Sequence, residues 1–269
     1  VLLCGLAFTA VSAWLTRDAE QSAERLRFER RVDEVISTIR TRMFDHEQLL
    51  RAAAGLWATD PQLGRQQWRA FVEQLNLQDS YPGLEGLGYV VHLRPEDVRP
   101  HEAALRAQGF ADYQLRPPGS RETYTAIVYL EPFSGRNLRA FGYDMFSESV
   151  RQQAMAVARD TGLPALSGKV TLVQETGSAP QAGTLLYHAI YRPGAPTQTV
   201  DQRRAALQGY VYSPFRMGDL MQSVLGDRAE DLALELFDGP APDPQALLYA
   251  RRASLGHSIP DWQPRHTAR

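Results

Sequence analysis

Apolar and polar positions divide the first sixty residues into two parts of one long predicted helix. Residues 1–16 are almost entirely apolar, and Thr9 and Ser12 are the only non-glycine polar residues before Thr16. At about 1.5 Å per residue this segment spans roughly 24 Å, which is short of the roughly 30 Å hydrocarbon core of a bilayer. Because no Gly or Pro lies between Trp14 and Ala54, we expect the same helix to continue into water over residues 17–58.

Residues 17–58 carry charged residues on one side of the helix and an apolar stripe on the other. Members of the stripe recur every three or four residues, the period of an α-helix: Phe28, Val32, Val35, Ile39 and Met43. We predict a partial transmembrane helix at 1–16 and a stalk helix at 17–58. The stripe would pack on the chain's own domain, pair two stalks in a homodimer, or do both. The rival interpretation of the first segment is a secretory leader cleaved near residues 10–13.

Beyond residue 59, short helical and extended patterns alternate. Gly and Pro separate these patterns, as expected for an antiparallel sheet with helices on one side. Helices are predicted at 65–77, 95–108, 149–162 and 214–225. Strands are predicted at 84–91, 113–115, 124–130, 138–145, 169–174, 184–191, 206–212, 232–237 and 246–250. The predicted fold class is α+β, in which a long N-terminal stalk helix is followed by two PAS-like antiparallel-sheet subdomains.

A segment rich in Gly, Pro, Thr and Gln at 193–202 predicts a linker between these two subdomains. The larger, membrane-distal, ligand-binding subdomain is expected at 59–192, and the smaller, membrane-proximal one at 203–256. The remaining residues, 257–269, are predicted to form a tail that runs towards a second membrane helix.

Composition and motifs exclude several classes of function. The net charge of −2 gives no basic surface for nucleic acid. Cys4 is the only cysteine, so no disulfide forms within the chain, which is compatible with a bacterial periplasm. The six histidines are scattered, and common nucleophile, phosphate-binding and metalloprotease motifs are absent. We therefore expect no metal, no cofactor and no enzymatic activity in this region.

Asp144 is the residue most suggestive of a binding site. It ends an aromatic, apolar segment just before a predicted helix, and an isolated carboxylate in such a place costs several kcal/mol unless it has a partner. The partner is either internal, such as the helix start near Ser147 or the side chain of Arg151, or a donor on a bound ligand. Aromatic residues nearby would supply walls for a pocket: Tyr124, Tyr129, Phe141 and Tyr143.

Several motifs in register resemble one known family of sensors. They lie at 81–89, 131–137, 142–151, 158–167 and 185–191, and together they look like the cyclase/histidine-kinase-associated sensory extracellular (CHASE) domain over roughly residues 30–225. The resemblance implies a small-molecule sensor in the periplasm, anchored in the inner membrane through the N-terminal helix. It also implies a diguanylate cyclase, cyclic-di-GMP phosphodiesterase or histidine kinase as output, and a homodimer formed through the stalk.

The resemblance further implies a set of ligand-binding residues. In the plant members, which bind cytokinins, an aspartate of the matching motif hydrogen-bonds the adenine ring, and Asp144 occupies that position. Leu166 matches a leucine that lines the same pocket. Thr171 and Thr176 both match the pocket's threonine. An adenine-like ligand is therefore implied.

Three other functions are compatible with the sequence. A double-PAS, Cache-like sensor for amino acids or carboxylates predicts a cationic rather than acidic pocket. A secreted hydrolase predicts a cleaved leader, and a purely structural dimerisation module predicts a filled pocket.

Overall fold

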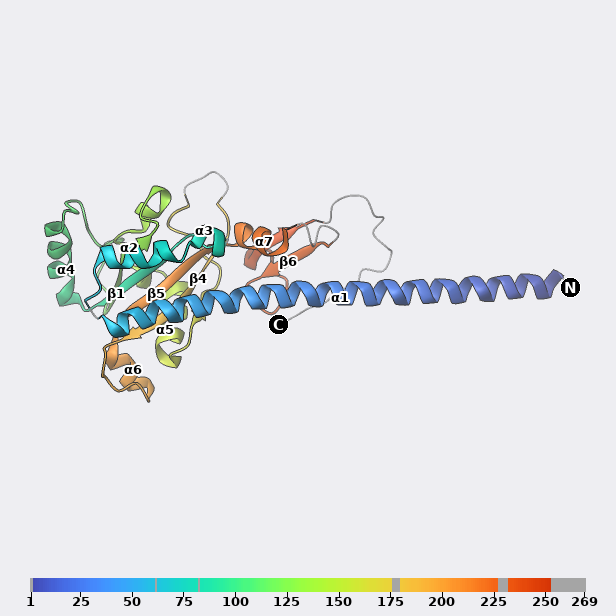
Figure 1. The fold of residues 1–269 in the computed structure, drawn as a ribbon, viewed down its shortest axis with the longest axis horizontal. Helices are drawn as coiled ribbons and strands as arrows, with labels where there is room; N and C mark the ends of the chain where they lie inside the picture. The colour runs from blue at the N-terminus through green and yellow to red at the C-terminus, as the bar shows by residue number, and fades with distance from the viewer. Residues whose placement is uncertain (1, 61, 82, 176–179, 227–231, 253–269) are drawn as a thin grey trace.

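One continuous helix, α1 (Leu2–Thr59), dominates the shape of the molecule. The computed structural model describes residues 2–60, 62–81, 83–175, 180–226 and 232–252. Figure 1 shows that the N-terminal part of α1 projects away from the other elements, while its C-terminal part lies along the sheet. Among the described residues, none of the helices combines the length and the apolar character that crossing a bilayer requires.

The main sheet has five antiparallel strands in the order β2-β1-β5-β4-β3. They are β1 (Leu87–Leu93), β2 (Tyr124–Glu131), β3 (Ala165–Leu166), β4 (Gly183–Tyr191) and β5 (Leu207–Arg216). Apolar residues and tyrosines fill both faces of the three central strands, so the sheet is covered on both sides.

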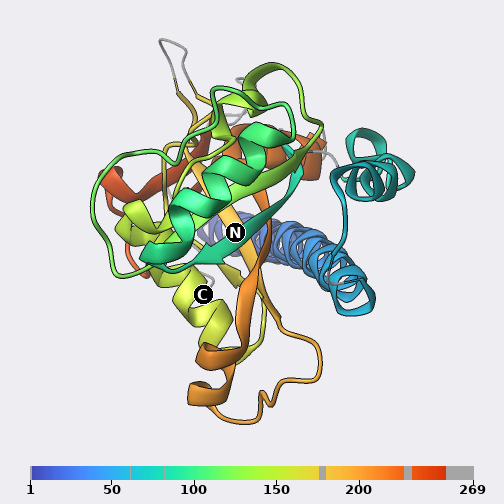
Figure 2. The same cartoon turned by 90° about the vertical axis from the view of Figure 1, so that its left-hand side faces the viewer.

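Different helices cover the two faces of the sheet. On one face α1 and α2 (Arg65–Gln74) bury Leu50, Trp57 and Trp68 against β1, β4 and β5. On the other face α5 (Ser149–Thr161) buries Ala154 and Met155. Figure 2 shows α1 and α5 on opposite sides of the sheet. The apolar stripe of α1 thus packs on the chain's own domain from about Val35 onward, as one of the two alternatives predicted.

The remaining described elements connect the strands or extend the fold towards the N-terminal part of α1. Connecting elements are α3 (Leu77–Ser80), α4 (Pro95–Ala107), η1 (Gly135–Ala140), η2 (Met145–Ser147) and α6 (Val200–Ala206). Beyond β5 come α7 (Met217–Leu225), β6 (Leu234–Phe237), η4 (Pro244–Ala246) and β7 (Leu247–Arg251). The β6–β7 hairpin lies alongside α1 (Figure 1).

The strand predicted at 206–212 is not part of a smaller sheet. It is the start of β5, which pairs with β1 on one side and β4 on the other at the centre of the main sheet. The segment 193–202 is a connection within this sheet, and it leads into α6. Only α7 and the β6–β7 hairpin therefore remain of the expected subdomain at 203–256, and the tail at 257–269 lies outside the described residues.

The strand predicted at 138–145 is also wrong. Its first residues form the 3-10 helix η1, and Gly142 then adopts a left-handed φ of 77°. A side chain there would bring its Cβ to 2.6 Å from the backbone oxygen of Gln114. The predicted segments 113–115 and 169–174 likewise form no strand, although Val170 makes an isolated bridge to Gly183. The helix at Ser149 is confirmed, but Glu148 caps it by accepting from the backbone N–H groups of Val150 and Arg151.

Candidate functional site

Asp144 is completely buried, and donors of its own chain bind one of its two oxygens. Its Oδ1 accepts from the backbone N–H of Thr125 at 2.8 Å, the hydroxyl of Thr125 at 3.1 Å and the backbone N–H of Phe146 at 3.1 Å. Its Oδ2 makes no hydrogen bond within the described part of the chain, although it lies 3.3 Å from Nη1 of Arg121. The second oxygen is therefore balanced by charge alone.

Arg121 covers Asp144 on the side towards solvent. Burial raises the pKa of Asp144, while the Thr125 and Phe146 hydrogen bonds and the charge of Arg121 oppose this rise. The Arg121 guanidinium lies 5.6 Å from the centre of the Tyr124 ring and donates to the carbonyls of Pro117 and Gly119 over 3.3 and 3.4 Å. Because these two contacts are long, Arg121 is held less firmly than Asp144.

The other predicted ligand-binding residues are spread over different parts of the fold. Tyr124 lies closest to the Asp144 environment, since its hydroxyl accepts from the backbone N–H of Arg121. Tyr129 and Phe141 pack into the cluster on the α1 side of the sheet, where the Tyr129 hydroxyl donates to the carbonyl of Leu63. Leu166 on β3 is 47% exposed and Thr171 is also exposed. The alternative residue Thr176 lies outside the described residues.

A small cavity lies between the α5-facing side of the sheet and the segment at 172–174. Its volume is about 10 Å³, which is room for about one water molecule. The lining combines apolar and polar side chains: Ile127, Ala140, Tyr143, Met145, Arg151, Leu172, Val173, Gln174, Leu185 and Tyr212. Tyr143 and Met145 flank Asp144 in the chain, so the cavity adjoins the predicted site without containing its carboxylate.

Arg151 and Tyr212 bring hydrogen-bond donors to the lining of this cavity, and Tyr187 stacks on Tyr212 beside it. Arg151, 4% exposed, donates from Nη1 to the Tyr143 hydroxyl at 3.0 Å and from Nη2 to the Thr171 carbonyl at 2.8 Å. The hydroxyls of Tyr212 and Tyr187 are buried and have no hydrogen-bond partner among the described residues. Burial raises the pKa of both tyrosines, so both hydroxyls stay protonated at neutral pH. The cavity therefore suits a ligand that accepts hydrogen bonds.

The Tyr212 ring packs directly against the backbone of Gly88, where any side chain would clash with it. The two residues are paired across β1 and β5, and a Cβ on Gly88 would lie 2.3 Å from the Tyr212 ring. The sequence did not single out Tyr187 or Tyr212, because it placed them in different subdomains. Their direct pairing across β4 and β5 brings them together, with ring centres 6.2 Å apart.

Arg151 was predicted as a partner of Asp144, but it binds Tyr143 and Thr171 instead. Within the described residues there is no group of three or more His, Cys, Asp or Glu side chains suited to hold a metal ion.

Comparisons with known proteins find one matching family model and a distant relative. A model of the CHASE domain matches residues 61–249, a range that includes the cavity and Asp144. The chain is 24% identical over 194 residues to hybrid signal transduction histidine kinase A of Dictyostelium discoideum. That alignment covers 66% of this chain but only 9% of the relative.

Proposed function

Since the family model matches more than half of its residues, the chain belongs to the CHASE domain family, and we propose that it is the ligand-sensing part of a larger membrane-bound signalling protein. CHASE domains are extracellular and sensory rather than catalytic. The relative's name supports a histidine kinase as the output, and a diguanylate cyclase or cyclic-di-GMP phosphodiesterase is the alternative.

The proposed ligand is a small molecule that carries a carboxylate or another strong acceptor, and it binds in the cavity beside Arg151. One observation carries this proposal: Tyr212, whose buried hydroxyl has no hydrogen-bond partner in the described part of the chain, lines the same cavity as Arg151. Leaving a buried donor unpaired costs about 1–3 kcal/mol, and a hydrogen bond to a charged group contributes about 1.5–3 kcal/mol. A ligand acceptor placed here removes the cost of the unpaired donor and adds the stabilisation of a hydrogen bond to the charged Arg151.

The second carboxylate oxygen of Asp144 favours another class of ligand. Its Oδ2 is buried without a hydrogen bond, so a planar heterocycle with N–H donors, such as an adenine-like compound, would bind there. Such a ligand has to displace Arg121, whose guanidinium now occupies that side of the carboxylate. The first class leaves the Arg121–Asp144 ion pair in place, and we therefore prefer it.

A thermal-shift screen of the full chain distinguishes the two ligand classes. The probes are short dicarboxylates and amino acids on one side, and adenine and N6-substituted adenines on the other. A ligand at about 100 times its dissociation constant adds about 2.7 kcal/mol of stability. Tyr212→Phe is expected to reduce a carboxylate-induced shift, whereas Asp144→Asn should leave it unchanged.

The reverse pattern, an adenine-induced shift lost in Asp144→Asn, would support the second ligand class. The proposal would be contradicted if neither ligand class stabilised the chain, or if neither substitution reduced the thermal shift.

Signal output is proposed to involve α1. This helix packs on the sheet from about Val35 onward, and its N-terminal part projects beyond the domain (Figure 1). A change in its packing would reach residues 1–16, the proposed partial membrane helix at the inner membrane, and a second copy of the stalk in a homodimer. Disulfide cross-linking between single cysteines placed along residues 17–34 tests the dimer, and absence of any cross-link at these positions would count against it.

A further inference from the structure

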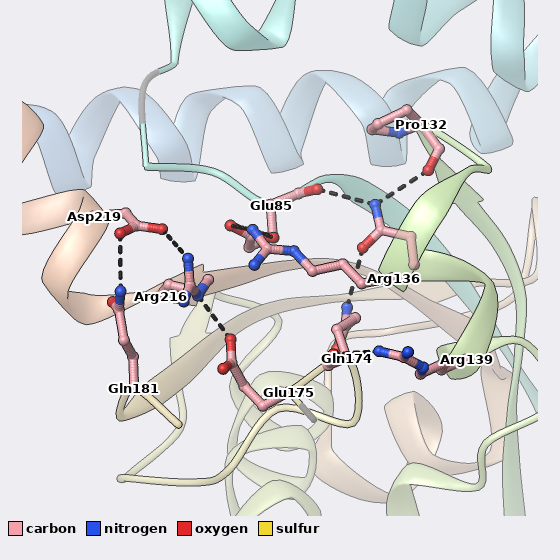
Figure 3. Close-up of polar contacts among 10 residues, drawn as sticks. Glu85, Pro132, Arg136, Arg139, Gln174, Glu175, Gln181, Arg216 and Asp219 are labelled. Atoms are coloured by element: carbon pink, nitrogen blue, oxygen red, sulfur yellow. Dashed lines mark hydrogen bonds and ion pairs between the residues drawn. The ribbon is translucent and has the colours of Figure 1, made fainter. Parts of the chain in front are cut away.

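A polar network connects the wall of the cavity to helix α7. We define the Arg216 network as Gln174, Glu175, Arg216, Asp219 and Gln181. Figure 3 shows Glu175, Arg216, Asp219 and Gln181 in a chain of contacts that runs from the segment before β4 to the first turn of α7. Gln174 joins this network through the backbone, as the neighbour of Glu175. Gln174 lines the cavity, and Glu175 follows it directly.

Arg216 stands at the centre of the network, where β5 ends and α7 begins. Its Nε donates to Oε1 of Glu175 at 2.6 Å, and its Nη1 donates to Oδ2 of Asp219. The Glu175 side chain is only 6% exposed and that of Arg216 19%, so water screens this pair less than a surface pair. A guanidinium is suited to this place because it holds two carboxylates in fixed directions at once.

On the α7 side of the network, Asp219 contacts Gln181, and the lack of a side chain at Gly218 makes room for this contact. Asp219 accepts from Nε2 of Gln181 at 3.0 Å on its other oxygen. Gly218 allows Gln181 to approach, since a Cβ there would lie 2.5 Å from Oε1 of Gln181. The first turn of α7 is thus bound to Arg216 and to the chain entering β4.

Two neighbouring side chains of the segment at 172–175, Gln174 and Glu175, contact different parts of the fold. Gln174 donates from Nε2 to Oδ1 of Asn137 at 3.4 Å, and Asn137 donates to the carbonyls of Glu85 and Pro132, both at 3.1 Å (Figure 3). Gln174 therefore belongs to the cavity wall next to η1, whereas Glu175 belongs to the contact with Arg216.

Any ligand larger than one water molecule has to displace part of the cavity wall. Four of the ten lining residues belong to β2, β4, β5 and α5, whose backbone groups bond within regular elements, and three belong to the single segment at 172–174. The residues at 172–175 form a turn, closed by a single backbone bond from Glu175 to Leu172 at 2.9 Å. This segment supplies more of the wall than any single strand or helix does, and Arg139 holds it by donating to the carbonyl of Gln174 at 3.2 Å. Its displacement to make room for a ligand shifts Glu175 relative to Arg216.

A shift of α7 reaches the elements that lead out of the domain. Met217, Leu220 and Met221 of α7 are buried in the same cluster as Val35 of α1, and the β7 residues Leu248 and Tyr249 pack against it. Val224 and Leu225 line a groove together with α1 residues around Val35.

We propose that the Glu175–Arg216–Asp219 contact couples occupancy of the cavity to the position of α7. This inference rests on the proposed function, since it takes the cavity as the ligand site. It adds a route from the ligand to the β6–β7 hairpin and α1 that does not depend on a direct contact between the ligand and the stalk.

Hydrogen exchange of the full chain, read by mass spectrometry, tests the coupling without any ligand. Ala140→Val fills the cavity from the η1 side, because Ala140 is 1% exposed and lines it. Exchange of the α7 amides should rise by at least about threefold in Ala140→Val, in line with coupling energies within one network. In a Glu175→Gln background the same cavity filling should have no effect, so the double variant Ala140→Val with Glu175→Gln should show the same α7 exchange as Glu175→Gln alone. Ala140→Cys is a gentler second variant if Ala140→Val fails to fold, and it is judged by the same outcome.

Arg204→Gln is the matched control, since it breaks an Arg–Asp pair, Arg204 with Asp160, that lies outside the network. It should leave α7 exchange unchanged. The proposal is overturned if cavity filling leaves α7 exchange unchanged, or if the increase persists in the Glu175→Gln background. Because no ligand is used, these outcomes are independent of the ligand screen, and a failure of either proposal is distinguishable from a failure of the other.

Discussion

Acidification should weaken the packing of α1 on the sheet, because α1 carries a buried neutral histidine at that interface. His46 is 2% exposed, and its ring meets the ring of Phe215 edge-on, with centroids 4.9 Å apart, and the ring of Tyr81 at 5.8 Å. Its Nδ1 has no hydrogen-bond partner among the described residues. Burial lowers the pKa of His46 from 6.5 to about 4, with Asp45 opposing this and Arg42 adding to it.

The magnitude follows from the difference between the folded and unfolded pKa values. Because the folded pKa is the lower one, the unfolded chain binds the extra proton first, and stability falls as the pH drops from about 6.5 to about 4. A lowering from 6.5 to about 4 corresponds to about 3 kcal/mol, all of it lost below pH 4. Above pH 6.5 His46 contributes no pH dependence.

Urea unfolding of the full chain at pH 7.5, 6.5, 5.5 and 4.5 measures the contribution of His46 to the free energy of unfolding. His46→Leu removes the titrating group, so its free energy of unfolding relative to that of the wild type should rise by about 2–3 kcal/mol as the pH falls across this range. Phe44→Leu, at an exposed position one half-turn away, is the control and should run parallel to the wild type. Parallel curves for His46→Leu and the wild type would refute the reasoning.

Three further substitutions test individual contacts by urea unfolding at pH 7.5. Gly88→Ala should cost about 1–3 kcal/mol, because its Cβ would lie 2.3 Å from the Tyr212 ring; a neutral effect would mean that the ring moves freely. Trp68→Ala should cost about 3–5 kcal/mol, since the side chain is fully buried between α2, α1 and the sheet; a loss below about 1 kcal/mol would contradict this packing. Glu148→Ala should cost about 1 kcal/mol through loss of the α5 cap, whereas Ser149→Ala should be nearly neutral, and the opposite order would contradict capping by Glu148.

Local signals in the sequence predicted the elements that depend on local interactions. The helix α4 begins with Pro95 at its first position, which its fixed φ favours, and ends before Gly109, whose φ is 99°. The strand β2 follows its apolar run almost to the residue. Both elements match the prediction because neighbouring residues determine them.

Long-range pairing determined the elements that the sequence did not predict. The Gly- and Pro-rich segment 193–202 separates β5 from β4 in the chain, and only the pairing of Tyr212 with Gly88 and Tyr187 shows that β5 is central. In the candidate site, burial of Asp144 was predicted, but its main internal partner is Thr125, nineteen residues earlier in the chain. The unpaired Tyr212 hydroxyl became visible only once the two strands lay side by side.

The central claim is that Tyr212 and Arg151 form a binding site for a small acceptor-bearing ligand. The most direct test is calorimetric titration of the carboxylate that gives the largest thermal shift into the wild type and into Tyr212→Phe. Loss of one buried hydrogen bond of about 1–3 kcal/mol predicts that the dissociation constant rises by roughly fivefold to a hundredfold in Tyr212→Phe. An unchanged dissociation constant in that variant would contradict the claim.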